Sequence, residues 1–275
     1  MKKAINRWCF PADWPVRRCL EWAAKAGFQG LEFNVAEEGE LNLETRAEKW
    51  RGLAQEAHDL GLALPSVSTA LHWKYPLTAS DEITRTKGWG IVRRMIETAR
   101  ALGADTVLVV PGLVTPEVDY ETAYKRSQEA LVSLSETAGS HQIVIGVENV
   151  WNRFLLSPLE FKRFIDETRS PWVKAYFDVG NVLATGYPEQ WIRILSGRIV
   201  KVHVKDFSTR VGNIAGFVPL LAGDVDWPAV MAALRAVGYD GWLTAELAPY
   251  RYHPELLIYQ TSHSLEAIIG AEADT

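Results

Sequence analysis

The chain has 275 residues, of which 48% are hydrophobic and 23% charged, a composition typical of a globular protein with an ample core. Its net charge of −5 gives no general attraction to a phosphate backbone, so we expect no nucleic-acid partner. No apolar run approaches the ~18 residues that a membrane helix needs, and Asn6 and Arg7 interrupt what would be the apolar core of a secretory signal. We therefore expect a cytoplasmic protein with no membrane partner, whose Cys9 and Cys19 stay reduced.

Apolar segments with strand character alternate along the whole chain with stretches of helical periodicity. The expected strands are Ala4–Trp8, Gly30–Asn34, Ala63–Ser68, Thr106–Val110, Ile143–Glu148, Lys174–Asp178, Ile199–Val204 and Trp242–Glu246. Such alternation predicts parallel strands joined by crossover helices. We predict an α/β fold, a (β/α)8 TIM barrel, with residues 1–275 forming a single domain. A doubly wound open sheet is the alternative, but no G-x-G-x-x-G follows the first strand.

Glycines mark where the expected helices end. Each sits just after a helical pattern and a few residues before the next strand, where a left-handed cap costs least for a residue without Cβ; they are Gly27, Gly61, Gly103 and Gly238. The helix before Gly103 is amphipathic, with one apolar stripe formed by Ile91, Met95, Ala99 and Leu102. The repeated joints favour a succession of similar βα units.

The fifth to eighth expected strands each end on a side chain that can bind a divalent cation. These are Glu148, Asp178, His203 and Glu246, separated by 30, 25 and 43 positions. In a barrel the C-terminal strand ends converge, and three converging carboxylates repel one another unless a cation compensates them. Oxygen donors with one imidazole suit a hard or borderline cation such as Mn²⁺ or Mg²⁺. The sequence therefore predicts one metal site.

The segments around these four residues carry recognisable motifs. They are Val147-Glu-Asn149, Phe177-Asp-Val-Gly-Asn181, Val202-His-Val-Lys-Asp206 and Glu246-Leu247, with Gly223-Asp-Val-Asp-Trp227 and Gly238-Tyr-Asp-Gly241. Together they resemble the signatures of the xylose isomerase-like sugar isomerase/epimerase barrels, over essentially the whole chain. Among these barrels the chain looks most similar to the 3-epimerases of ketopentose phosphates and free ketoses.

The resemblance implies one divalent metal ion, Mn²⁺ first and Mg²⁺, Co²⁺ or Zn²⁺ as alternatives, held by Glu148, Asp178, His203 and Glu246. It also implies that Glu148 and Glu246 are the catalytic acid/base pair, that the partner is a small-molecule sugar or sugar phosphate, and that the protein can form a homo-oligomer. The chemistry asks for such a pair: epimerisation next to a carbonyl needs one group to remove a proton and another to return one to the opposite face. A metal at the carbonyl oxygen stabilises the intervening enediolate.

Five further residues are expected to contact substrate. His72 follows the third strand and is placed to hydrogen-bond a sugar hydroxyl, with a structural loop histidine as the alternative. Glu32 would orient a metal ligand or a substrate hydroxyl, or form a structural ion pair. Asn181 would contact substrate or cap the following segment, and Asp206 would fix an imidazole tautomer or bind substrate. Arg210 is the cationic choice for a substrate oxygen or phosphate.

Three other cations in presumed βα loops, Lys74, Lys205 and Arg251, are expected to be solvated charges. The leading functional hypothesis is metal-dependent C3 epimerisation of a ketose or ketose phosphate, with aldose–ketose isomerisation as the alternative. A lyase or dehydratase, a sugar-binding barrel without turnover and a metal-dependent endonuclease at abasic sites follow. The endonuclease fits least, because its multinuclear zinc site would need many histidines and the chain has six.

Overall fold

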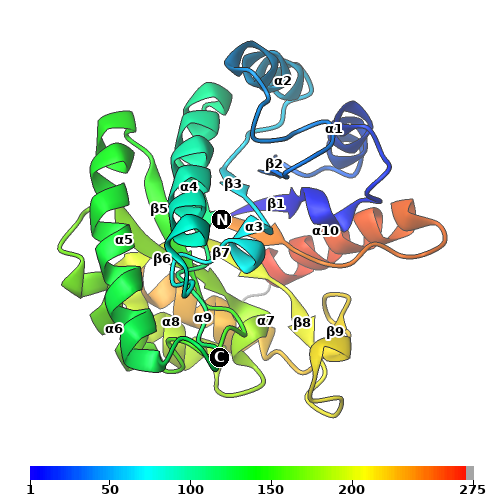
Figure 1. The fold of residues 1–275 in the computed structure, drawn as a ribbon. Helices are drawn as coiled ribbons and strands as arrows, with labels where there is room; N and C mark the ends of the chain where they lie inside the picture. The colour runs from blue at the N-terminus through cyan, green and yellow to red at the C-terminus, as the bar shows by residue number, and fades with distance from the viewer. Residues whose placement is uncertain (271–275) are drawn as a thin grey trace. The chain divides into compact units, whose positions relative to one another are not determined.

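The computed structural model describes residues 1–270 and places the eight expected strands in a closed barrel of order β1-β10-β7-β6-β5-β4-β3-β2. Neighbouring strands run parallel, so the predicted (β/α)8 class is confirmed. The barrel strands are β1 Lys2–Asn6, β2 Gly30–Asn34, β3 Ser66–Ser68, β4 Thr106–Val109, β5 Val144–Glu148, β6 Val173–Asp178, β7 Ile199–Val204 and β10 Trp242–Ala245 (Figure 1).

Helices connect the strands. They are α1 Val16–Lys25, α2 Ala47–Asp59, α3 Leu71–Lys74, α4 Glu82–Leu102, α5 Tyr120–His141, α6 Pro158–Glu167, α7 Val179–Val182, α8 Pro188–Leu195, α9 Trp227–Ala236 and α10 Pro254–Gly270. Short 3₁₀ turns occupy Arg7–Cys9, Ser196–Arg198 and Ile214–Gly216, and a small antiparallel hairpin pairs β8 Asp206–Phe207 with β9 Phe217–Val218. The hairpin was not expected from the sequence.

By their contacts the residues group into two compact units. One contains 1–32, 55–63 and the residues from 177 onward, and the other contains 33–54 and 64–176. In the second unit α4 and α5 lie side by side (Figure 1). The prediction that residues 1–275 form a single domain stays a prediction.

Two predicted strands, the first and the third, differ from the structure by more than one residue, each for a local reason. The first strand ends at Asn6 rather than Trp8, because the Asn6 side chain accepts a hydrogen bond from the Trp8 amide and starts a 3₁₀ turn. The third strand is only Ser66–Ser68, with an isolated bridge from Ala63 to Gly30. Pro65 lies between them and has no amide hydrogen to donate to the ladder.

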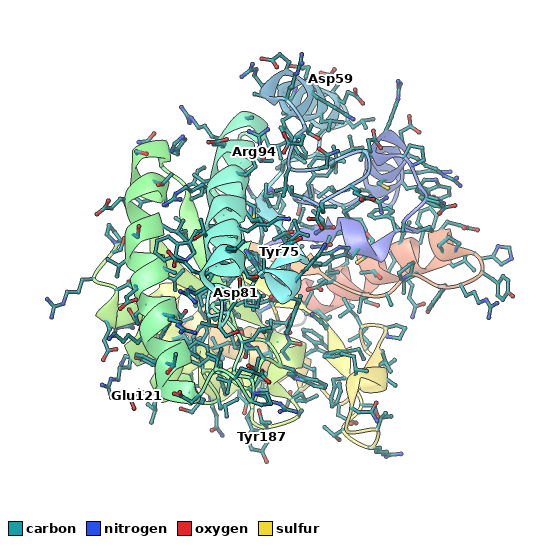
Figure 2. The ribbon with its side chains drawn as sticks, viewed as in Figure 1. Asp59, Tyr75, Asp81, Arg94, Glu121 and Tyr187 are labelled. Atoms are coloured by element: carbon teal, nitrogen blue, oxygen red, sulfur yellow. The ribbon has the colours of Figure 1, made fainter. Side chains whose placement is uncertain are left out.

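The helix ends follow the capping signals in the sequence. Asp81 and Asp119 accept hydrogen bonds from the amides of Thr84 and Thr122 at the start of α4 and α5 (Figure 2 labels Asp81). The four glycines expected to cap helices all have positive φ, between 73° and 80°. The stripe predicted for α4 is buried, with Ile91, Met95, Ala99 and Leu102 at most 4% exposed.

The interior beneath the end of β5 is filled by one large ring. Tyr176 is fully buried, and its hydroxyl lies 3.1 Å from the Ser66 hydroxyl. Gly146 makes room for it, since a Cβ there would lie 3.0 Å from the Tyr176 ring and 3.3 Å from Thr106. Side chains alternate along a strand, so Gly146 and Glu148 share a face. The ring therefore fills the interior beside Gly146, on the face of β5 that also carries Glu148.

Among residues 1–270, none of the helices combines the length and the apolar character that crossing a membrane requires.

Two glycines of α4 provide a test of how this helix packs. Gly88 is buried, and a Cβ there would lie 2.5 Å from the Tyr75 carbonyl oxygen, whereas a Cβ at Gly90 would meet nothing within 4 Å. We expect Gly88→Ala to destabilise the protein by about 1–3 kcal/mol through overpacking. Gly90→Ala, on the same helix, should stabilise it by about 0.5–1 kcal/mol through helix propensity. Urea unfolding of both variants checks this, and equal effects would contradict the packing.

Candidate metal and active site

The four predicted metal ligands stand where the sequence placed them, at C-terminal strand ends. Glu148 and Asp178 are the last residues of β5 and β6, His203 is the last but one of β7, and Glu246 directly follows β10. Asp178 and His203 are fully buried and Glu148 is 5% exposed. Because a barrel turns these ends inward, their side chains can reach a common point.

One donor atom from each of the four residues lies within 4.8 Å of the others. Around a cation with ligands at about 2.1 Å, neighbouring donors are about 3 Å apart and opposite ones about 4 Å apart. The 4.8 Å limit is less than 1 Å wider than this, so small side-chain shifts would bring the four donors around a single ion. Three carboxylates and one imidazole also form a chemically suitable donor set for a divalent metal.

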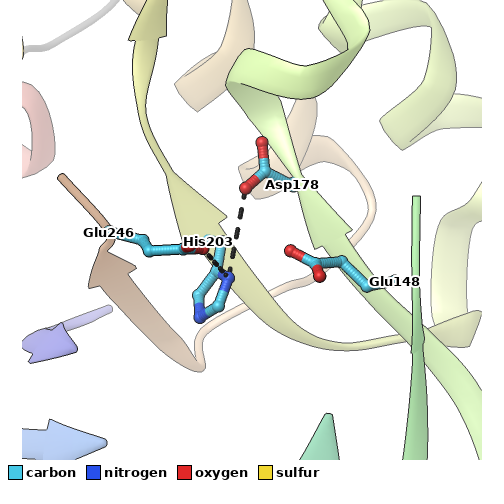
Figure 3. Close-up of side chains that lie close together, drawn as sticks. All are labelled: Glu148, Asp178, His203 and Glu246. Carbon is cyan, nitrogen blue, oxygen red and sulfur yellow. Dashed lines mark ion pairs between the residues drawn. The ribbon is translucent and has the colours of Figure 1, made fainter. Parts of the chain in front are cut away.

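His203 lies at the centre of the site. Its Nδ1 is 2.9 Å from Glu246 Oε2 and 4.0 Å from Asp178 Oδ2, and Figure 3 shows both contacts as dashed lines. Its Nε2 is 2.9 Å from Glu32 Oε1 on the other side of the ring. Nδ1 is therefore the nitrogen that faces the carboxylate cluster.

Glu32 orients this imidazole. It is fully buried on β2, and Oε1 also accepts a hydrogen bond from the Asn6 side-chain amide. A carboxylate that accepts the second N–H of a metal-binding histidine fixes its tautomer and ring orientation. Of the roles expected for Glu32, this geometry favours orienting a ligand, while a direct substrate contact stays a prediction.

Lys205 is a site residue that the sequence analysis missed. Expected to be solvated, it has a side chain only 15% exposed, with Nζ 3.0 Å from Glu246 Oε2 and 3.3 Å from Asp178 Oδ2. The expectation was wrong because the two-residue period of β7 was not extended past its end: His203 and Lys205 have the same parity and point to the same side. Lys74 and Arg251 are exposed, as expected.

The charges in this cluster shift two carboxyl groups in opposite directions. Burial raises the pKa of Asp178, and the neighbouring Lys205 ammonium only partly opposes it. Burial would also raise the pKa of Glu246, but the charges of Lys205 and His203 outweigh it and lower this pKa to about 2. Glu246 is therefore ionised at neutral pH.

Cys9 fixes the backbone on both sides of Glu246. Its thiol donates to the Ala245 carbonyl at 3.3 Å and accepts from the Leu247 amide at 3.1 Å. Burial raises the pKa of Cys9 to about 12, so the sulfur keeps the proton that it donates. No sequence motif signals this contact, because β1 and β10 become neighbours only when the barrel closes.

Asp206 organises the loop that follows β7. Its Oδ1 accepts from the amides of Phe207 and Val225, and its Oδ2 accepts from the Leu221 amide and the Trp227 indole. The two carboxylate oxygens thus hold the segment 207–227 through these hydrogen bonds. These four hydrogen bonds favour a role in holding the loop, while the expected contacts of Asp206 with an imidazole and with substrate stay predictions.

Asn181 adjoins the site, whereas Arg210 is shown only as an exposed residue of the loop after β7. The backbone amide of Asn181 donates to Asp178 Oδ1 at 2.7 Å, so Asp178 caps α7. The other oxygen of Asp178 faces His203 and Lys205. Arg210 is exposed in the loop that Asp206 holds. Substrate contacts of both side chains stay predictions.

His72 presents a polar atom to the interior. It is 1% exposed on α3, and its Nδ1 accepts a hydrogen bond from the Val110 amide at 3.3 Å. In the neutral ring the proton must then be on Nε2, which has no hydrogen-bond partner among residues 1–270. Asn34, which the sequence analysis did not single out, donates to Ser68 but leaves its Oδ1 without a partner in the same described part of the chain.

The chain belongs to the xylose isomerase-like TIM barrel family, whose sequence profile matches residues 20–268. It is 29% identical over 263 residues to SgbU of Escherichia coli (strain K12), provisionally named an L-ribulose-5-phosphate 3-epimerase; 93% of this chain and 91% of SgbU are covered. It is 28% identical over 226 residues to L-ribulose-5-phosphate 3-epimerase UlaE of Escherichia coli (strain SMS-3-5), with 81% and 78% covered.

Solved structures share the fold. A D-psicose 3-epimerase in the presence of D-fructose superposes with a TM-score of 0.84 at 17% identity, covering 98% of this chain and all of that one (100%). The IOLI protein with a bound zinc atom gives a TM-score of 0.80 at 18% identity, with 98% of both chains covered.

Lowering the pH should reduce the folding stability through the buried, neutral side chain of His72. Burial lowers the pKa of His72 from 6.5 to about 4. The unfolded chain therefore binds this proton more readily than the folded one, and the stability present above pH 6.5 is lost as the pH falls toward 4, by about 2 kcal/mol at pH 5. In His72→Asn, Oδ1 takes the place of Nδ1 and does not titrate. We expect the gap in unfolding free energy between wild type and this variant to narrow from pH 7 to pH 5; a constant gap in urea titrations would contradict the neutral buried ring.

Proposed function

We propose that this protein is an enzyme of the isomerase class that uses a divalent metal to epimerise C3 of a ketose or ketose phosphate. The observation that carries the proposal is the cluster of Glu148, Asp178, His203 and Glu246, whose donor atoms lie within 4.8 Å of one another. The named activities of UlaE and SgbU on L-ribulose 5-phosphate support the same reaction.

The reaction needs two proton carriers, and Glu148 and Glu246 fill both roles. One carboxylate takes the proton from C3, the electron pair moves into the C2 carbonyl to give an enediolate, and the other carboxyl returns a proton to the opposite face of C3. Glu246, ionised because Lys205 and His203 lower its pKa, suits the base in one direction. A divalent ion bound by the four residues would supply Lewis-acid stabilisation of the developing negative charge.

Mn²⁺ is the ion we propose. Carboxylate oxygens favour hard cations such as Mg²⁺ and Mn²⁺, and the imidazole of His203 shifts the preference toward Mn²⁺, with Co²⁺ and Zn²⁺ as alternatives. Glu32 would keep His203 Nδ1 pointed at the ion through its contact with Nε2.

The substrate contacts we propose use polar atoms that the fold leaves available. His72 Nε2–H is a buried donor and Asn34 Oδ1 a buried acceptor, which suits sugar hydroxyls. Arg210 lies in an exposed loop, where it can bind a substrate phosphate. We also propose Asn181 as a substrate contact beside Asp178. A ketopentose 5-phosphate is our first choice, on the strength of the two named relatives; a cytoplasmic location and homo-oligomer formation stay predictions.

The test is hydrogen exchange into substrate. The Mn²⁺-loaded protein is incubated in D₂O with free ketoses and their 5- or 6-phosphates, and the products are read by NMR. We expect deuterium at C3 together with inversion at that carbon in one substrate. Deuterium confined to C1 or C2 with aldose formation would replace the epimerase by the aldose–ketose isomerase, and no exchange with any sugar would refute both.

The acid/base role is tested by Glu246→Gln. The amide cannot carry the proton, so turnover of the identified substrate should fall about 10²–10⁴-fold, while sugar binding persists. Glu117→Gln, in an exposed loop, is the matched control and should keep wild-type turnover. Metal content of each variant is measured in parallel, and near-normal turnover of Glu246→Gln would remove Glu246 from the mechanism.

A further inference from the structure

Lys205 forms ion pairs with one carboxylate oxygen of Asp178 and one of Glu246, two of the four predicted metal ligands. Its Nζ lies 3.0 Å from Glu246 Oε2, the same oxygen that His203 Nδ1 contacts, and 3.3 Å from Asp178 Oδ2. These are ion-pair distances to two of the four predicted ligands. The ammonium group of Lys205 thus already places one positive charge beside two of the four predicted ligands.

The surroundings of Lys205 hold it there. A Cβ at Gly180 would lie 2.8 Å from the Lys205 Cβ and 2.9 Å from its carbonyl oxygen, so α7 packs directly on the Lys205 backbone. The Nζ also lies 5.5 Å from the centre of the Phe217 ring on β9. With a side chain only 15% exposed, Lys205 is largely enclosed by neighbouring elements.

We propose that Lys205 is an internal competitor of the metal ion. The ammonium neutralises Asp178 and Glu246 when no metal is bound and keeps the two carboxylates side by side. A divalent cation that binds these oxygens must displace it or accept its repulsion, and either effect lowers the affinity for the metal. Lys205 therefore makes the site exchange its metal readily and keeps the metal-free form folded. The inference rests on the metal site of the proposed function.

The experiment compares Mn²⁺ and Mg²⁺ binding by calorimetry in the wild type and in Lys205→Met. Methionine keeps an unbranched apolar stem beside Phe217 and removes the charge. We expect Mn²⁺ to bind Lys205→Met at least about tenfold more tightly. The metal-free variant should melt at a lower temperature than the metal-free wild type, and Mn²⁺ should raise its melting temperature by more. Lys174→Met, a matched charge removal at the opposite end of β6 from Asp178, should change neither quantity.

Lys205→Arg keeps the positive charge and guards against a variant that fails to fold; it should bind Mn²⁺ as weakly as the wild type does. Equal or weaker Mn²⁺ binding by Lys205→Met, or tight binding by Lys205→Arg, would overturn the competition. Detectable Mn²⁺ binding by Lys205→Met alone would support the competition by Lys205. If none of the proteins binds Mn²⁺, both the competition and the metal site are refuted. If competition holds but no sugar exchanges deuterium, only the proposed reaction fails.

Discussion

Compensation of buried negative charge is the constraint on which the whole site depends. Glu32, Glu148 and Asp178 are at most 5% exposed, and Glu246 joins them from the end of β10. Carboxylates lose hydration on burial and repel one another at these distances, so each needs a cation or hydrogen-bond donors. The barrel supplies them from the strand ends themselves.

The compensation is arranged as a chain of directed contacts. Asn6 donates to Glu32, Glu32 accepts from His203 Nε2, and His203 presents Nδ1 to Glu246 and Asp178. Each contact restricts the rotation of one further side chain. The contact of Glu32 with Nε2 thereby fixes the imidazole in the absence of a metal ion, which lowers the reorganisation that metal binding would require.

The sequence predicted the parts of this arrangement that depend on local signals. Apolar runs that stop at Glu148, Asp178 and His203 predict both the strands and the residues that cluster at their ends, because strand direction in a barrel determines where these ends meet. Contacts made by barrel closure carry no such signal, and the Cys9 thiol beside Glu246 is an example. Lys205 falls between the two cases: its parity with His203 was readable, but loop composition favoured a solvated charge. The loop role of Asp206 depends on partners up to 21 positions away, which no local pattern identifies.

The same electrostatics separates the chemistry from the choice of substrate. A phosphate brought close to Glu148, Asp178 and Glu246 would meet three carboxylates whose charge Lys205 offsets only in part. Under the proposed function, a phosphorylated sugar is therefore expected to hold its phosphate toward the exposed loops. The loop that carries Arg210 is held by Asp206 through four hydrogen bonds, independently of the four metal ligands. Under the proposed function, changes in that loop can therefore alter preference for phosphorylated or free ketoses while the strand-end residues stay the same. This is the physical reason why the strand-end motifs indicate the kind of reaction but not the particular sugar.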